Sequence, residues 1–94
     1  MFEIKDSGEG KVEMVGRFDA SQMAEARTVL DALATSATID FGRLDYISSA
    51  GLGLLLGTQK RLSGSGNSLK LLNMNKHIRE IFRIAGFDRI FDIE

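Results

Sequence analysis

The 94-residue chain contains no cysteine, no proline and only one histidine. Without cysteine it has neither disulfides nor a thiol nucleophile, which fits a reducing compartment such as the cytoplasm. Because His77 is the only imidazole in the chain, we expect no metal site built from histidines. The lack of proline means that none of the expected helices is broken by that residue.

Long apolar runs and concentrated charge are also missing. The longest apolar stretch, residues 50–57, is far shorter than the ~20 residues that cross a bilayer. The first ten residues lack the basic and apolar segments of a secretory signal. The net charge is −1, with both signs interspersed, whereas nucleic-acid binding needs a concentrated basic face. We therefore expect one domain spanning residues 1–94, with no nucleic acid and no membrane among its partners.

Strand and helix patterns alternate along the chain. Residues 2–6 and 11–18 alternate apolar and polar side chains around a glycine-containing turn, which is typical of a β-hairpin. Extended patterns return at residues 37–47 and 68–74, and helical spacing of apolar side chains marks residues 19–36, 50–62 and the segment from Asn75 to Gly86. The order ββαβαβα predicts an α/β fold with a mixed sheet, because strands joined through helices pair in parallel.

Ser48 and Ser49 stand where the extended residues 37–47 give way to a leucine-rich helix. Either serine is explained by capping, since a serine oxygen accepts a hydrogen bond from a free N–H of the first helical turn. The same helix end also suits a phosphate, because it carries partial positive charge. A phosphoserine would add about −1.5 to −2 charges, which the helix end tolerates and a partner packed over it would not. From the residues alone both interpretations stay open.

Glycine interrupts this leucine-rich helix at Gly51, Gly53 and Gly57. A helical glycine costs roughly 1 kcal/mol relative to alanine, which indicates a close approach by another part of the domain or by a partner. The spacing matches neither a dinucleotide fingerprint nor a P-loop. Asp19, at the start of the preceding helix, is better explained as an N-cap than as a partner contact.

No residue set in the chain suggests catalysis. A nucleophilic serine needs a base, and His77 in the first turn of the third helix is the only histidine. The Gly-x-Ser-x-Gly pattern is absent as well. We therefore expect a protein that is not an enzyme and that uses no cofactor and no metal.

Three segments carry a resemblance to a known family: "GRFDA" (16–20), "LDYISSAGLGLLLG" (44–57) and "KLLNMNKHIREIFRIAGFDRIFDI" (70–93). They closely resemble the STAS domain family, and more narrowly its stand-alone bacterial anti-sigma factor antagonists. The resemblance covers essentially the whole chain. It implies the SpoIIAA-like fold, an α/β fold in which a mixed four- to five-stranded sheet has helices packed mainly on one face.

The resemblance also implies a phosphorylation-switched binding module that takes part in partner switching. In that family the unphosphorylated protein sequesters an ATP-dependent serine kinase that doubles as an anti-sigma factor. Phosphorylation by this kinase releases the complex, and a metal-dependent protein serine phosphatase reverses the modification. On this basis we expect a cytoplasmic regulator of transcription that is a monomer or weak dimer.

The same resemblance implies Ser49 as the phosphorylated residue, with Ser48 as the alternative. The best-known sporulation-type members have Asp-Ser-Ser-Gly here, with the acceptor directly before the glycine, whereas this chain has Ser-Ser-Ala-Gly. Alanine cannot be phosphorylated, and in the Ser-Ser-Ala-Gly form that other members share the natural acceptor is Ser49. The expected partner-binding residues are Asp19, Ser48, Ser49, Ala50, Gly51, Leu52 and Gly53.

Two other functions are open on the same resemblance. The module could act in a partner-switching system for a target other than a sigma factor, such as secretion, biofilm formation or motility. It could also be a STAS sensor that binds a small anion or nucleotide at the helix N-terminus. For the second function the nearest cations in sequence are Arg17 and Arg43, which form no basic cluster.

Overall fold

The computed structural model describes all residues 1–94. Its strands are β1 (Phe2–Asp6), β2 (Lys11–Phe18), β3 (Ala37–Ile47), β4 (Leu69–Leu72) and β5 (Asp92–Ile93). Its α-helices are α1 (Met23–Asp31), α2 (Ser49–Ser63) and α3 (Lys76–Ile84), and two short 3-10 turns are η1 (Ala20–Gln22) and η2 (Phe87–Arg89). None of these helices has the length and apolar character needed to cross a membrane.

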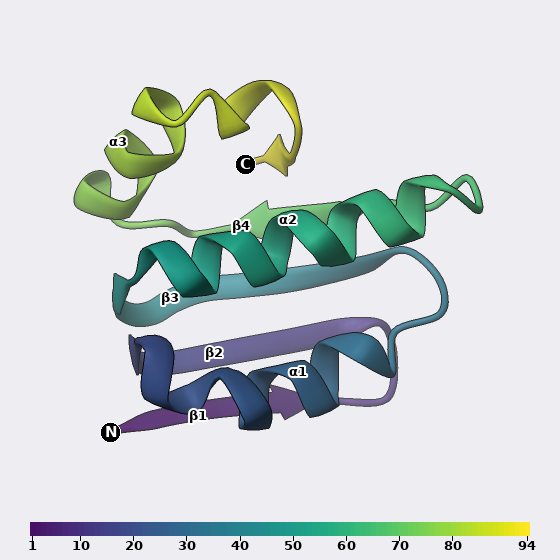
Figure 1. Ribbon diagram of the computed structural model, residues 1–94, viewed down its shortest axis with the longest axis horizontal. Coiled ribbons are helices and arrows are strands. Elements are labelled where there is room, and N and C mark those ends of the chain that lie inside the picture. The colour runs from purple at the N-terminus through teal and green to yellow at the C-terminus, as the bar shows by residue number, and fades with distance from the viewer.

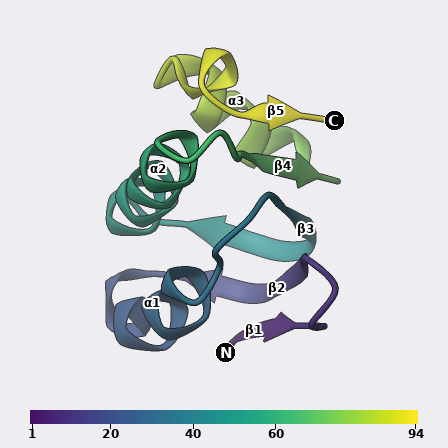
Figure 2. The ribbon, with the colours of Figure 1, turned by 90° about the vertical axis from the view of Figure 1, so that its right-hand side faces the viewer.

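All five strands belong to one sheet, in the order β1-β2-β3-β4-β5. β1 pairs antiparallel with β2, and every later pairing is parallel, which confirms the predicted mixed sheet. α1 lies over β1 and β2, and α2 lies over β3 and β4 (Figure 1). In the turned view both helices lie on the same side of the sheet (Figure 2). The expected packing of helices mainly on one face is therefore confirmed.

The core lies between this helical layer and the sheet and forms one cluster of 21 buried residues. Period-two alternation along β3 directs Ile39 and Phe41 into it, while Asp40 between them faces the other side. From α3, Phe82 packs edge-on against Phe41, with 6.0 Å between ring centroids. Exposed charged side chains such as Glu3 occupy the remaining face of the sheet.

Two predicted helices differ in detail from the structure. The first ends at Asp31 rather than near Ser36, although Leu33 stays buried beyond its end. Asn75 at the start of the third helical pattern predicts an N-cap, and the structure confirms it, because Asn75 Oδ1 accepts from Ile78 N at 2.8 Å. Helical spacing places Ala85 on one face with Ile78, Ile81 and Phe82 and so predicts that it is buried, but Ala85 is exposed. It is the C-cap residue, and the left-handed Gly86 that follows, with φ 76°, turns the chain away from the helix.

Two polar side chains of α2 hold neighbouring elements in place. Gln59 is 7% exposed; its Oε1 accepts from Leu69 N at 2.8 Å and its Nε2 donates to Ile90 O at 3.2 Å. Arg61 donates to the carbonyls of Leu33 and Leu30 at 2.8 and 2.9 Å, so it satisfies carbonyl groups at the end of α1. These two residues fix α2 against β4, the C-terminal segment and α1.

Candidate functional site

The candidate site lies at the edge of the sheet where the parallel strands end. Asp19 follows β2, and Ser48 follows β3, and these strands are parallel neighbours. The backbone N–H of Ser48 donates to the carbonyl of Phe18 at 2.9 Å, so the start of α2 is joined directly to the end of β2. Carboxyl ends of parallel strands are where α/β proteins usually place their functional groups.

Ser48 is the N-cap of α2. Its Oγ accepts a hydrogen bond from Gly51 N at 3.1 Å, and its backbone is extended, with φ −86° and ψ 168°. Its carbonyl accepts from Leu52 N at 2.9 Å, the first bond of the helical ladder. The capping explanation is therefore confirmed for Ser48, whose half-buried hydroxyl already serves the fold.

Ser49 is the first residue of α2 and is exposed. Its side chain forms no hydrogen bond within the protein, unlike that of Ser48. The first turn of α2 contains no acidic residue, so no neighbouring carboxylate in that turn would oppose added negative charge. The free N–H groups and partial positive charge of the helix end favour such a charge at this position.

The structure separates the roles of two glycines near this helix start. A Cβ at Gly51 would lie 3.0 Å from Ile47 Cγ1 and 3.2 Å from Phe18 Cδ2, and both side chains are buried. Close packing within the domain therefore accounts for a glycine at position 51. Gly53 is exposed, and a Cβ there would meet nothing within 4 Å. No contact inside the fold accounts for a glycine at that position.

Asp19 caps the turn that leads into α1. Its Oδ1 accepts from the backbone N–H of Ser21 at 2.9 Å and from the Ser21 hydroxyl at 2.6 Å. In return, Asp19 N donates to Gln22 Oε1 at 2.9 Å, which completes a capping box. The two bonds from Ser21, the hydroxyl bond first, lower the pKa of the Asp19 carboxyl, and the charges of Arg17 and the N-terminus act in the same direction. Asp19 is thus a half-buried, stable anion beside the start of α2.

In the sequence Arg17 stands out only as a cation near the start of the serine-bearing helix, but the structure pairs its side chain with Tyr46. Its guanidinium lies 4.3 Å from the centre of the Tyr46 ring, an arrangement in which the cation is attracted to the aromatic face. The two residues are register partners on β2 and β3, so the strand pairing is the signal that could have found them. Arg43, the other cation considered, is exposed and sits opposite Val15.

The other candidate residues do not gather into a reactive centre. His77 is exposed on the first turn of α3. The structure brings together no group of three or more His, Asp or Glu side chains that could hold a metal ion. What the site offers is an exposed hydroxyl at a helix N-terminus, beside an anionic cap, at the carboxyl end of the parallel strands.

A small α/β module with such a serine-bearing helix is the class defined by this fold and site. A family model described as "Mlab, STAS domain" matches residues 2–92, and the chain belongs to the STAS domain family. BtrV of Bordetella bronchiseptica, which is classed by name with the anti-sigma factor antagonists, is 40% identical over 81 residues, covering 85% of this chain and 70% of that protein. The anti-sigma-B factor antagonist of Bacillus subtilis is 33% identical over 86 residues, covering 88% and 79%.

Solved structures show the same fold at lower identity. An anti-sigma factor antagonist from Mycobacterium paratuberculosis has a TM-score of 0.82 at 19% identity, over 99% of this chain and 83% of that chain. The phosphorylated form of SpoIIAA, a Bacillus cell fate determinant, has a TM-score of 0.73 at 22% identity, over 100% and 91%. These matches confirm the expected SpoIIAA-like fold. The names of the relatives describe regulatory binding proteins, in agreement with the sequence-based rejection of catalysis.

Proposed function

We propose that this chain is an anti-sigma factor antagonist whose binding is switched by phosphorylation of Ser49. The observation that carries the proposal is the difference between the two serines. Ser48 Oγ is used as the N-cap of α2, whereas Ser49 is exposed and its hydroxyl is free. The proposal is also supported by relatives named as anti-sigma factor antagonists and by the existence of SpoIIAA in phosphorylated and unphosphorylated forms.

In the proposed cycle the unphosphorylated protein binds a cytoplasmic serine kinase that is also the anti-sigma factor. The kinase transfers the γ-phosphoryl group of ATP to Ser49 Oγ; ADP leaves, and the hydroxyl proton passes to a base on the kinase. A metal-dependent phosphatase later hydrolyses the phosphoserine to serine and inorganic phosphate. This chain supplies the acceptor and the binding surface.

The proposed contact surface surrounds the first turn of α2. Ser49 and Gly53 are exposed, and Ala50 and Leu52 are partly exposed, so a partner can reach all four. Gly51 is buried and acts through the shape of the turn. At one side of this surface Asp19 offers a fixed carboxylate to a donor on the partner.

The direct test is capture of partners from native lysate with immobilised wild type and Ser49→Asp, followed by mass spectrometry. We expect a serine kinase of the anti-sigma type on the wild-type bait and at least tenfold less of it on Ser49→Asp, which corresponds to about 1.4 kcal/mol of binding free energy. Ser63→Asp is the matched control, since Ser63 is also exposed on α2 but lies at its far end.

The kinase identified in this way is then purified and incubated with ATP and each serine variant. Ser49→Ala should lose incorporation of phosphate, whereas Ser48→Ala should retain it. Equal incorporation by wild type and Ser49→Ala would contradict the assignment of the acceptor. Equal capture of the kinase by wild type and Ser49→Asp would contradict the switch.

A further inference from the structure

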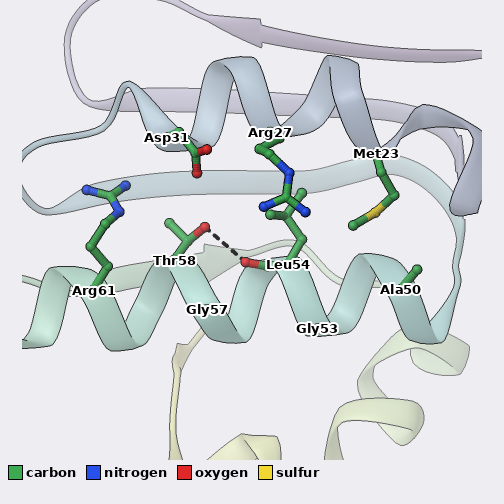
Figure 3. A pocket seen from close by; sticks show the side chains of 9 residues that line it. All are labelled: Met23, Arg27, Asp31, Ala50, Gly53, Leu54, Gly57, Thr58 and Arg61. Carbon is green, nitrogen blue, oxygen red and sulfur yellow. Dashed lines mark hydrogen bonds between the residues drawn. The ribbon is translucent and has the colours of Figure 1, made fainter.

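A groove separates α1 from α2 on the helical face of the domain. Its volume is about 370 Å³. Arg27 and Asp31 border it from α1, and Ala50, Gly53, Gly57 and Arg61 border it from α2 (Figure 3). The two helices run in the same direction along it, so its Ala50 end lies beside the proposed phosphorylation site.

The groove contains two glycines that the fold does not require. Gly53 and Gly57 are four residues apart on α2, both are exposed, and a Cβ at either would meet nothing within 4 Å. Each lowers helix stability by about 1 kcal/mol relative to alanine. At Gly51, by contrast, an added Cβ would lie within 3.4 Å of the side chains of Ile47 and Phe18. At Gly53 and Gly57 no contact within the domain offsets this cost, and the space beside them is open to a partner.

The charges along the groove define the chemistry of what approaches. Arg27 is exposed, is directed toward α2 and takes part in no ion pair or hydrogen bond within the protein (Figure 3). The guanidinium of Arg61 donates to backbone carbonyls, so no carboxylate neutralises its positive charge. Asp31 is the only carboxylate on the lining, and α2 contains no acidic residue from Ser49 to Ser63. The groove is therefore net positive and complementary to an acidic segment.

We propose that this groove is the docking site for an acidic segment of the anti-sigma factor kinase. A carboxylate of that segment pairs with Arg27, and its backbone or a small side chain lies against Gly53 and Gly57. The inference rests on the proposed function and extends it from the serine to the surface beside it. It also explains release: a phosphoserine at Ser49 brings about −1.5 to −2 charges to the end of the groove and repels the acidic segment.

Alanine substitutions of the two glycines test the proposal through opposite effects on stability and binding. Gly53→Ala and Gly57→Ala, singly and together, should raise the free energy of unfolding in urea and weaken binding of the purified kinase, with the double variant at least tenfold weaker. Ser63→Ala, exposed on α2 outside the groove, is the control and should leave binding unchanged. If the alanine variants bind the kinase within twofold of wild type, or if they destabilise the fold, the proposal is wrong.

Charge reversal at Arg27 is a second, independent test. Arg27→Glu should weaken kinase binding at least tenfold at low salt and flatten its salt dependence, because one attractive pair is lost. Arg89→Glu, an exposed arginine on η2, should leave both unchanged. The two levels of proposal fail differently. If Ser49→Asp weakens kinase binding but the glycine and arginine variants bind like wild type, only the groove proposal is overturned. If wild type binds no such kinase, both proposals are overturned.

Discussion

Removing the buried amide of Gln59 should destabilise the domain by a predictable amount. Gln59→Leu keeps the approximate volume of the side chain but leaves the Leu69 N–H, otherwise bonded at 2.8 Å, without its partner. A buried donor without a partner costs about 1–3 kcal/mol, and loss of the bond to Ile90 O adds about 1 kcal/mol. The expected total of about 2–4 kcal/mol is a large part of the roughly 5–15 kcal/mol that stabilises a domain.

Three measurements follow the effect of Gln59→Leu. Urea unfolding gives the loss of stability directly, and at about 4–8 °C per kcal/mol the midpoint of thermal unfolding should fall by at least ~8 °C. Hydrogen exchange at the Leu69 amide should accelerate specifically, because that donor has lost its acceptor. Lys60→Leu is the matched control, since Lys60 is the next residue of α2 and is exposed. A Gln59→Leu variant within about 0.5 kcal/mol of wild type, with Leu69 still protected, would refute the reasoning.

Gln59→Glu separates the two bonds. The carboxylate can still accept from Leu69 N but can no longer donate to Ile90 O, so exchange at Leu69 should stay slow while the C-terminal segment loosens. Burial raises the pKa of such a carboxyl, and its protonated form can donate again. The stability deficit of Gln59→Glu should therefore shrink as the pH falls, and a deficit independent of pH would contradict a buried carboxyl at this position.

Three further outcomes are expected at the start of α2 and at the cap of α1. Ser48→Ala should lower the free energy of unfolding in urea by about 1 kcal/mol, as for other N-caps, while Ser49→Ala should stay within about 0.5 kcal/mol; equal losses would contradict the assignment of the cap. Gly51→Ala should lower the free energy of unfolding by up to about 2 kcal/mol, because overpacking of the new methyl group against Ile47 exceeds the gain in helix propensity. A stabilised Gly51→Ala variant would contradict this close packing. Because the pKa of the Asp19 carboxyl is lowered in the folded protein, the ionised group stabilises the fold at pH values above its ordinary pKa, and this stabilisation is lost as the pH falls through the lowered pKa. The loss of unfolding free energy in Asp19→Asn, measured in urea, should therefore be largest at neutral pH and shrink in acid. A loss that is the same at every pH would exclude the charge as its cause.

The elements and the serine cap could be predicted because their causes are local. Alternating side chains in residues 11–18 and 37–47 produce the strands, whatever lies across from them. The cap at Ser48 needs only the N–H of Gly51, three residues along the chain. The parallel pairings follow from the helices between the strands. The strand patterns and the cap depend on residues close in sequence, and the pairings follow from the order of the elements.

Features that depend on distant neighbours could not be predicted. Glycine is the same residue at positions 51 and 53, and only the packing of Ile47 and Phe18 around position 51 separates their roles. Gln59 has the pattern of an ordinary polar helix residue, yet its partners are Leu69 and Ile90, 10 and 31 residues away. Periodicity places a side chain at an angle around a helix, but it does not say which element lies there. The groove between α1 and α2 was missed for the same reason.

The order of the strands in space, β1 to β5, is also their order along the chain. As the protein leaves the ribosome, each new strand therefore finds its neighbour already made and never has to insert between two formed strands. Synthesis from the N-terminus suits such stepwise growth. The bond from Gln59 to Ile90 can form only once the C-terminal segment, which closes the far edge of the sheet, has been made.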